Sequence, residues 1–475
     1  RAIFVMSIEA EFKRHFVIFF VIFFSGGMLQ LVNTMEGSYA RSLITCDLLV
    51  FSRSDSPFPE SAHCGDRKLV INEGQMLSAT AQSLEMFSKI VVMLFAAIFS
   101  DIYGRKLALM IGLSCVTISV GLFIIGAQIP SMARICFFLG QGLQGAYPAE
   151  LIAAQVAGDL AGLEDTDTTS VYSCFGIIGS LSMLCFLVAG MIVQSMQVTD
   201  YTLVWSCVFL FNVVQLLVAF KSIPETRPGG QKEIHDGIVS ALRTEINEYK
   251  GLLNLPGIKI SLLGRSFKSL AAGVSSLQQS LPMALYDMPI STILVLFVPA
   301  ILMTILGQPI VAGMCDKRGE LATFSICNVW LFSSNIFCLF IPLHWIAYYG
   351  QLYMCAIILQ GFNNLGSAMS AKMVGDKVAK FTALNSLGFY AISILSGPLY
   401  ASTFDAKAIT YFSKLQPYMI SLFFRMLELM CWFHPTFGSW QVIKQGLASL
   451  TEERNRLKVE EKEKDEKAVA EKKDD

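Results

Sequence analysis

The stretch DIYGRK, residues 101–106, joins two long apolar segments, and a shorter version, DKRG at residues 316–319, follows about 215 residues later. In a chain of 475 residues this separation is close to half the length. A second pair of residues, Asp159 and Asp376, has nearly the same separation, and each aspartate follows a glycine near the end of an apolar segment. Two matching pairs at one offset predict an internal duplication with one copy in each half of the chain.

The composition places the chain in a membrane. Hydrophobic residues make up 54% of the sequence and charged residues only 15%, whereas about a quarter of a soluble protein is charged. The apolar residues gather in runs near the length that a helix needs to cross the hydrocarbon core. We therefore predict a polytopic α-helical membrane protein. The five histidines show no metal-ligand spacing, and no nucleophile–base set or phosphate loop suggests an enzyme, so we expect neither a metal nor a cofactor.

Twelve spans are predicted in two sets of six, separated by a polar connector. The first set is 15–34, 73–100, 106–128, 131–157, 170–194 and 201–221, and the second is 262–285, 290–313, 321–343, 345–371, 380–402 and 411–433. We expect a segment at 1–14, an N-terminal half at 15–221, the connector at 222–258, a C-terminal half at 259–435 and a charged tail at 436–475. Residues 233–249 of the connector are expected to form an amphipathic helix on the membrane surface.

Lysine and arginine set the expected orientation. They concentrate at both ends of the chain, in the connector and in the 101–106 and 316–319 loops, and such loops favour the cytoplasmic side. We expect an integral multi-pass protein of the plasma membrane or an organelle membrane with both termini in the cytoplasm. Cys46 and Cys64 then lie in a first loop on the opposite side, where an oxidising compartment would allow a disulfide.

The repeated loop resembles the signature of the major facilitator superfamily of secondary transporters, G-x-x-x-D-x-x-G-R-K/R. The residues that carry the resemblance are Asp101, Gly104, Arg105 and Lys106 in the first copy and Asp316, Lys317, Arg318 and Gly319 in the second. Ala97 and Ala312 replace the first glycine of each copy. The resemblance implies an all-α membrane fold of twelve helices in two pseudo-symmetric six-helix halves. It also implies that these loops gate the protein, with Asp101 facing the start of the eleventh span.

In this family the first, fourth, seventh and tenth helices line a central cavity. Each of those spans carries amide side chains near its middle, namely Gln30, Asn33, Gln141, Gln144, Gln278, Gln279, Gln360, Asn363 and Asn364. Amides donate and accept hydrogen bonds, which suits a hydroxylated or amide-bearing neutral solute. The alternative is that they bond from helix to helix without touching any solute.

Charged residues inside spans are the remaining candidates for function. We consider Glu150, Arg134 and Glu85 as proton-coupling residues. A carboxyl in an apolar setting can load and release a proton, although Glu150 could equally bond to a neighbouring helix. Arg134 could attract an anion or take part in the coupling. Glu85 has Lys89 four residues on, and Arg425 has Glu428 three residues on, so each pair is also spaced to neutralise itself on one helix face. Arg265 and Lys268 are expected to extend towards the cytoplasmic surface.

The sequence favours a secondary active or facilitative transporter of a small polar organic solute that works by alternating access. We expect a monomer that contacts the lipid bilayer and the solute but no nucleic acid, and proton coupling stays open. Two alternatives remain: a drug or xenobiotic efflux transporter, and a transporter-like receptor or complex subunit that no longer transports.

Overall fold

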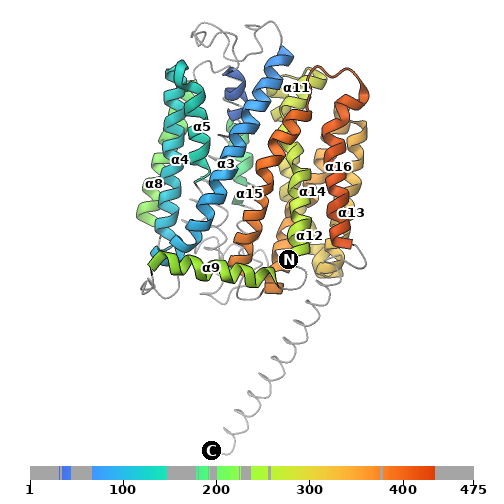
Figure 1. Cartoon of the computed structure of the whole chain (residues 1–475). Helices are drawn as coiled ribbons and strands as arrows, with labels where there is room; N and C mark the ends of the chain where they lie inside the picture. Colours follow the sequence, from blue (N-terminus) through green and yellow to red (C-terminus); the bar gives the residue numbers. More distant parts are fainter. Residues whose placement is uncertain are drawn as a thin grey trace, which may run out of the picture.

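The computed structural model describes residues 32, 35–43, 67–146, 178–179, 181–190, 192, 201–223, 225, 237–254, 258–374 and 378–433. Every regular element within these residues is a helix, and the long helices form one bundle (Figure 1). The side chains of some residues in this part of the chain, among them Asp101, Asp316 and Asn364, are outside the description.

The N-terminal half contributes the end of the first span at residues 35–42 and five further segments. These are α3 (Arg67–Tyr103), α4 (Arg105–Gln128), η1 (Pro130–Met132) with α5 (Ala133–Gln144), the helical segment Leu181–Gly190 and α8 (Tyr201–Ser222). The connector helix expected at 233–249 is α9 (Gly237–Leu253). Figure 1 shows α9 lying across one end of the bundle, roughly perpendicular to the long helices. We call this the connector end, and the opposite end, where α3 begins, the loop end.

The C-terminal half contains α10 (Ile258–Ala272), η2 (Gly273–Leu277), α11 (Ser280–Tyr286), α12 (Ile290–Arg318), α13 (Glu320–Ile336), η3 (Phe337–Phe340), α14 (Trp345–Val374), α15 (Val378–Thr403) and α16 (Tyr411–Phe433). The predicted spans from the eighth to the twelfth each coincide with one of these helices within a few residues, or with a helix and its 3-10 extension. The expected seventh span is instead divided into α10, η2 and α11.

Proline explains the break in the seventh span. Pro282 has no N–H and cannot donate to the carbonyl of Gln278, four residues earlier. The hydroxyl of Tyr348 on α14 donates to that carbonyl instead, at 3.2 Å. The carbonyl of Gln278 therefore keeps a hydrogen-bond partner although the helix is broken.

The first span was predicted to end several residues before the helix does in the structure. The helix was expected to stop at Thr34, but residues 35–42 are helical. Glu36 and Arg41 consequently lie on a buried helix and not in the first loop, with 2% and 5% of their surfaces exposed. Charged residues that follow an apolar run are typical of a loop, but these two side chains face the interior of the bundle.

The duplicated loop has the same backbone conformation in both halves. Gly104 ends the α3–α4 turn with φ 104° and ψ 156°, and Gly319 ends the α12–α13 turn with φ 80° and ψ 160°. Each glycine is also the residue that precedes its following helix. A positive φ strains any residue with a Cβ, which explains glycine at both positions.

Each half has its own hydrophobic core. Tyr39, Phe123 and Trp205 belong to the N-terminal core, and Tyr348 and Tyr400 to the C-terminal core. Ile71 at the start of α3 belongs to the C-terminal core, so α3 reaches across to the other half. The two halves are therefore joined through α3.

The α3–α15 seam is the contact between the halves that the structure describes most fully, with the two helices side by side in Figure 1. Ser83 donates to the carbonyl of Ile394 at 2.8 Å, and Asn72 accepts from the backbone N–H of Ala406 at 2.9 Å. Towards the connector end the same seam is filled by Met93 and its neighbours. The halves therefore touch along much of the length of these helices.

The outer surface of the bundle is apolar, as a lipid-facing surface must be. Among the described helices, α4, α8, α12 and α13 with its 3-10 extension are long and apolar enough to cross a membrane by length and composition. On α8, Leu203, Leu210 and Leu217 lie on one face and are 55–64% exposed. Together with the fold, this makes the chain an integral membrane protein.

Candidate functional site

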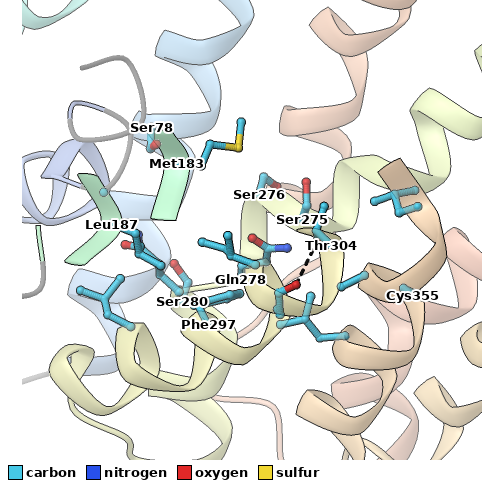
Figure 2. Close-up of a pocket in the computed structure, with 18 of the residues that line it drawn as sticks. Ser78, Met183, Leu187, Ser275, Ser276, Gln278, Ser280, Phe297, Thr304 and Cys355 are labelled. Atoms are coloured by element: carbon cyan, nitrogen blue, oxygen red, sulfur yellow. Dashed lines mark hydrogen bonds between the residues drawn. The ribbon is translucent and has the colours of Figure 1, made fainter. Parts of the chain in front are cut away.

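A cavity of about 410 Å³ lies between the two halves (Figure 2). It is lined from the N-terminal half by residues 35–42, α3 and the 181–190 segment, and from the C-terminal half by η2, α11, α12 and α14. Its volume falls within the range of about 300–1,000 Å³ of small-molecule sites. The cavity therefore has the size and the position of a solute site shared by both halves.

The cavity is lined by hydrogen-bonding groups and by apolar side chains. The amides are Gln75, Gln82, Gln278 and Gln279, and the hydroxyls are Ser78, Ser275, Ser276, Ser280 and Thr304. The apolar wall includes Leu294, Phe297, Ile301, Leu352 and Leu359 from α12 and α14. Such a wall can hold a solute that has both polar groups and a hydrocarbon part.

Gln75 ties the two halves together at the edge of the cavity. Its Nε2 donates to the carbonyl of Ser276 at 3.1 Å, and its Oε1 accepts from the hydroxyl of Ser280 at 2.5 Å. Leu187 of the N-terminal half packs against Ile290 and Leu294 of α12. Both contacts hold the halves against each other in the part of the bundle nearer the loop end.

Arg41 brings a positive charge to the cavity. Among the described lining residues it carries the only charged side chain. Its Nη2 donates to the hydroxyl of Ser38 at 3.2 Å, and its side chain lies against the backbone of Gly74, where any Cβ would collide with it. A glycine at position 74 thus lets α3 approach the first helix closely enough to enclose the guanidinium.

Glu36 lies one helical turn away, behind the polar wall. Its Oε1 accepts from the hydroxyl of the cavity residue Ser78 at 3.2 Å, and its Oε2 has no hydrogen-bond partner within the described structure. Gln141 of α5 lies beside this carboxyl. Sequence reasoning missed both Glu36 and Arg41 because it placed them outside the first span.

The two charge pairs predicted from helical spacing are both formed. Glu85 and Lys89 approach to 2.6 Å on α3, and Arg425 and Glu428 to 2.6 Å on α16. Lys89 also lies over the ring of Tyr390 on α15, 5.4 Å from its centroid. Glu85 is therefore engaged in an ion pair that reaches the seam between the halves.

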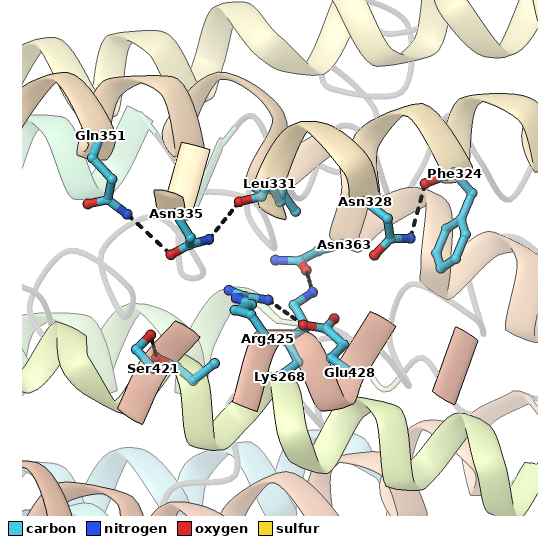
Figure 3. Close-up of polar contacts among 11 residues, drawn as sticks. Lys268, Phe324, Asn328, Leu331, Asn335, Gln351, Asn363, Ser421, Arg425 and Glu428 are labelled. Atoms are coloured by element: carbon cyan, nitrogen blue, oxygen red, sulfur yellow. Dashed lines mark hydrogen bonds and ion pairs between the residues drawn. The ribbon is translucent and has the colours of Figure 1, made fainter. Parts of the chain in front are cut away.

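A second polar network lies inside the C-terminal half (Figure 3). Lys268 of α10 donates to Oδ1 of Asn363 on α14, and the Arg425–Glu428 pair of α16 faces the same space. Arg265 donates to the carbonyl of Gly366 at 3.1 Å. The expectation that Arg265 and Lys268 extend to the cytoplasmic surface is wrong, because both side chains bond to α14 within the bundle.

The predicted amides fall into three groups within the described structure and a fourth outside it. Gln278 and Gln279 line the cavity. Gln141 and Gln144 are buried in the N-terminal half, and their amide atoms have no hydrogen-bond partner within the described structure. Gln360 and Asn363 lie on α14 outside the described lining. Gln30, Asn33 and the side chain of Asn364 lie outside the described residues. The role of all these amides in binding a solute stays a prediction.

Other candidate residues are placed as follows. Arg134 donates to the carbonyl of Leu43 at 3.3 Å, which ties α5 to the end of the first helix. Glu150, Cys46 and Cys64 lie outside the described residues. Within the part of the chain that the structure describes, no three His, Cys, Asp or Glu side chains are grouped to hold a metal ion.

The turn at residues 101–106 is bonded to Glu225, which lies just after α8. Glu225, just after α8, accepts from the backbone N–H groups of Arg105 and Lys106 at 2.8 and 3.2 Å. A carboxylate at this position stabilises the positive end of the α4 dipole. A Cβ on Gly104 would collide with this carboxylate. In the second loop the first residue of α13 is itself acidic, Glu320.

Of the basic residues in these loops, one bonds to a nearby residue of α3 and two are exposed. The Nη1 of Arg105 donates to the hydroxyl of Ser100 at 3.0 Å. Lys317 and Arg318 are exposed in the last turn of α12, where a positive charge is favourable. The gating role of Asp101 and Asp316 stays a prediction, since their side chains are outside the description.

Comparisons with known proteins define the fold. No protein-family model matches the sequence, and neither does any curated protein. Solved structures do match. A D-xylose–proton symporter superposes with a TM-score of 0.63 at 12% identity, covering 89% of this chain and 98% of that one. A POT-family transporter in complex with 5-aminolevulinic acid gives 0.62 at 12% identity, covering 88% and 96%. A human organic anion transporter gives 0.59 at 16% identity, covering 86% and 98%. The chain thus has the fold of the major facilitator superfamily transporters.

Proposed function

We propose that this protein is a secondary transporter that moves a small polar organic solute across a membrane by alternating access. The observation that carries the proposal is the cavity between the two halves, lined by amides and hydroxyls from both of them. In transporters built from repeats, the solute binds at the interface of the repeats and the halves rock around it. The solved structures that resemble this chain include sugar, nucleoside and organic anion transporters.

The cavity chemistry favours this function over the two alternatives. An efflux transporter for varied apolar compounds would gain little from a wall of amides and hydroxyls, which are costly to bury unless they find polar partners. A receptor that does not transport would not need its two halves to move apart. Gln75 makes two hydrogen bonds between the halves and Ser83 makes one, each of about 1 kcal/mol, so rocking can break them.

For the coupling ion, Glu36 is the carboxyl that suits a proton. It is buried and bonded to the cavity residue Ser78, and one of its oxygens has no hydrogen-bond partner within the described structure. A proton on that oxygen would remove an isolated charge from the bundle. Glu85 is less suited because Lys89 already neutralises it. Glu150 remains a second candidate.

The expected orientation places α9 and both termini in the cytoplasm, in a monomer of the plasma membrane or an organelle membrane. The cavity would then exchange its solute with the cytoplasm at the connector end and with the outside or a lumen at the loop end. The hydrogen bonds of Gln75 and Asn72 lie near the loop end and would have to open once in each cycle.

Uptake into proteoliposomes tests the proposal. The purified full chain is reconstituted and offered labelled sugars, nucleosides and organic acids, with and without an inward proton gradient. Ala300→Trp is expected to abolish uptake because it fills the cavity from α12. Leu302→Trp is the matched control, since Leu302 lies on the same helix and is 43% exposed towards lipid.

The outcomes separate the hypotheses. Saturable uptake that is lost in Ala300→Trp and kept in Leu302→Trp supports transport through this cavity. Saturable binding without uptake of any solute, by protein that is well folded, would favour the receptor alternative. For the coupling ion, Glu36→Gln is expected to remove the response to the proton gradient, whereas Glu73→Gln, on the exposed face of α3, should keep it.

A further inference from the structure

A group of buried polar side chains lies behind the cavity, where the first helix, α3 and α5 meet. Glu36 of the first helix bonds to Ser78 of α3, and Gln141 of α5 lies beside the same carboxyl. Among the described residues, the charged side chains that act electrostatically on Glu36 are Glu85 of α3 and its partner Lys89. The three elements therefore surround a polar site within the N-terminal half.

The amides of α5 face this site. Gln144 and Gly145 follow Gln141 by three and four residues, so they share its face of α5. A Cβ on Gly145 would collide with the carbonyl oxygen of Glu85, which shows that this face of α5 touches α3. Both amides therefore lie where the two helices meet, one helical turn apart.

Several atoms of this group are buried without a hydrogen-bond partner within the described structure. They are Oε2 of Glu36 and both amide atoms of Gln141 and of Gln144. These three side chains are at most 2% exposed. Buried polar atoms without a partner are costly, and native structures keep them where water or an ion supplies the missing contacts. Such a group of atoms between packed helices indicates a bound species.

The charges of the site favour a monovalent cation. The two carboxylates of Glu36 and Glu85 face the single ammonium of Lys89, which leaves one negative charge among these side chains. An unbalanced charge is unfavourable in a low-dielectric interior. A monovalent cation balances it, whereas a divalent cation would leave a positive charge and water alone would leave the negative one.

The ligand atoms are those that hard metal cations prefer. The site offers a carboxylate oxygen from Glu36 and amide oxygens from Gln141 and Gln144, and hard cations bind oxygen ligands. The N–H₂ group of each amide can donate to a carboxylate oxygen at the same time. Because α5 packs directly on α3 at Gly145, a small ion such as Na⁺ or Li⁺ suits the site better than K⁺.

We propose that Glu36, Gln141 and Gln144 form a binding site for a monovalent metal cation, Na⁺ or Li⁺, beside the solute cavity. The ion competes with the proton for Glu36, because a metal ligand must be deprotonated. Ser78 connects the ion to the solute, since it bonds to Glu36 and lines the cavity. The inference rests on the proposed function and deepens it by naming a second coupling ion, but binding of the ion can be measured without transport.

Thermal unfolding of the purified full chain in detergent measures the binding. Sodium, lithium, potassium or choline chloride is titrated at constant ionic strength. Sodium and lithium are expected to raise Tm to a plateau, because an ion that binds only the folded protein stabilises it. Potassium and choline should leave Tm nearly unchanged. A lower pH should raise the half-saturating Na⁺ concentration, because the proton then occupies Glu36.

Two variants and a control locate the site. Glu36→Gln removes the charge and is expected to raise the half-saturating Na⁺ concentration at least tenfold. Gln141→Leu removes an amide ligand together with two buried atoms that lack partners within the described structure, so it should fold and still weaken Na⁺ binding at least tenfold. Asn328→Leu is the matched control, since Asn328 is a buried amide of α13 that bonds to the carbonyl of Phe324 on its own helix. It should change the half-saturating concentration less than threefold.

Each outcome bears on a stated claim. Equal effects of sodium, potassium and choline on Tm would overturn the cation site. A sodium response that survives in both Glu36→Gln and Gln141→Leu would also overturn it. Saturable solute uptake by protein that binds no sodium or lithium would refute the ion site and leave transport standing. Sodium binding by well-folded protein that moves no solute would support the ion site and remove the proposed function.

Discussion

Gln75 bonds the two halves to each other near the loop end, and replacing it with alanine is expected to let the halves separate there. The side chain donates to the carbonyl of Ser276 and accepts from the hydroxyl of Ser280, so Gln75→Ala removes two hydrogen bonds between the halves. At about 1 kcal/mol each, the closed arrangement loses about 2 kcal/mol. Since 1.4 kcal/mol corresponds to a factor of ten, the open-to-closed ratio should rise roughly thirtyfold. An open population of about 3% would then become about half.

The assay is a distance measurement across the loop end in the absence of solute. Spin labels are attached through bioorthogonal amino acids at Glu73 on α3 and at Ile409, just before α16, so that the native cysteines remain. Both positions are exposed, Ile409 by 90%. Double electron–electron resonance should show a longer-distance population in Gln75→Ala.

Two controls make this result interpretable. Thr80→Ala removes a hydroxyl from α3 that bonds to the carbonyl of Met76 on its own helix, so it should leave the distances unchanged. Ser280→Ala should produce about half the effect of Gln75→Ala, and the double variant should show less than the sum because the two residues share one bond. A Gln75→Ala distribution that matches Thr80→Ala would refute the assignment of Gln75 as a contact that holds the loop end closed.

Three further predictions concern stability. Gly307→Ala should destabilise the protein by about 1–3 kcal/mol in thermal or denaturant unfolding, because its Cβ would collide with the carbonyl of Ile357 where α12 meets α14. The control Gly313→Ala has open space around it and should cost far less. Glu428→Gln should cost about 3–5 kcal/mol by leaving Arg425 charged and buried without its carboxylate, and an unchanged melting temperature would contradict that pairing. Glu225→Ala should lose about 0.5–2 kcal/mol as the cap of α4 is removed, and Glu225→Gln, which keeps an acceptor, should lose less.

Much of the architecture could be predicted because a bilayer imposes simple rules. Apolar length sets the spans, so α12, α14 and α16 begin and end within a few residues of expectation. Local spacing sets the two ion pairs, since residues three or four apart share a helix face. The turn at Gly104 and Gly319 follows from the repeated sequence and the need for a positive φ.

The first span was misplaced because hydropathy does not distinguish a solvent-exposed loop from a polar helix that faces a cavity. Residues 36–42 include a glutamate, an arginine and serines, which look like a loop. A signal was nevertheless present. Val32, Met35, Tyr39 and Leu43 recur at helical spacing, and all four are buried. A continued apolar stripe would have extended the helix and placed Glu36 and Arg41 inside the bundle.

Other features depend on partners that are distant in sequence. Pro282 signals a break in the seventh span, but the hydroxyl of Tyr348 that compensates for it comes from α14. Lys268 and Asn363 are both polar residues within spans, yet only the packing of α10 against α14 brings them together. Single-sequence patterns contain no information about such pairs. For the same reason the amides were predicted as a set, and the structure separates those at the cavity from those within each half.

The coupling proton proposed for Glu36 predicts how transport of an acidic solute would respond to voltage. If the solute carries one carboxylate and Glu36 takes up one proton, each cycle carries one negative and one positive charge and no net charge. A carboxylate moving alone would be opposed by an inside-negative potential of 100 mV by about 2.3 kcal/mol, which is a roughly fiftyfold lower accumulation ratio. With the proton the penalty cancels. Accumulation of the acid in proteoliposomes clamped by potassium and valinomycin should therefore depend on the pH gradient and not on the potential. In Glu36→Gln the proton is lost, so the full voltage dependence should appear. Wild-type uptake of an acid that already shows this voltage dependence would refute proton uptake by Glu36.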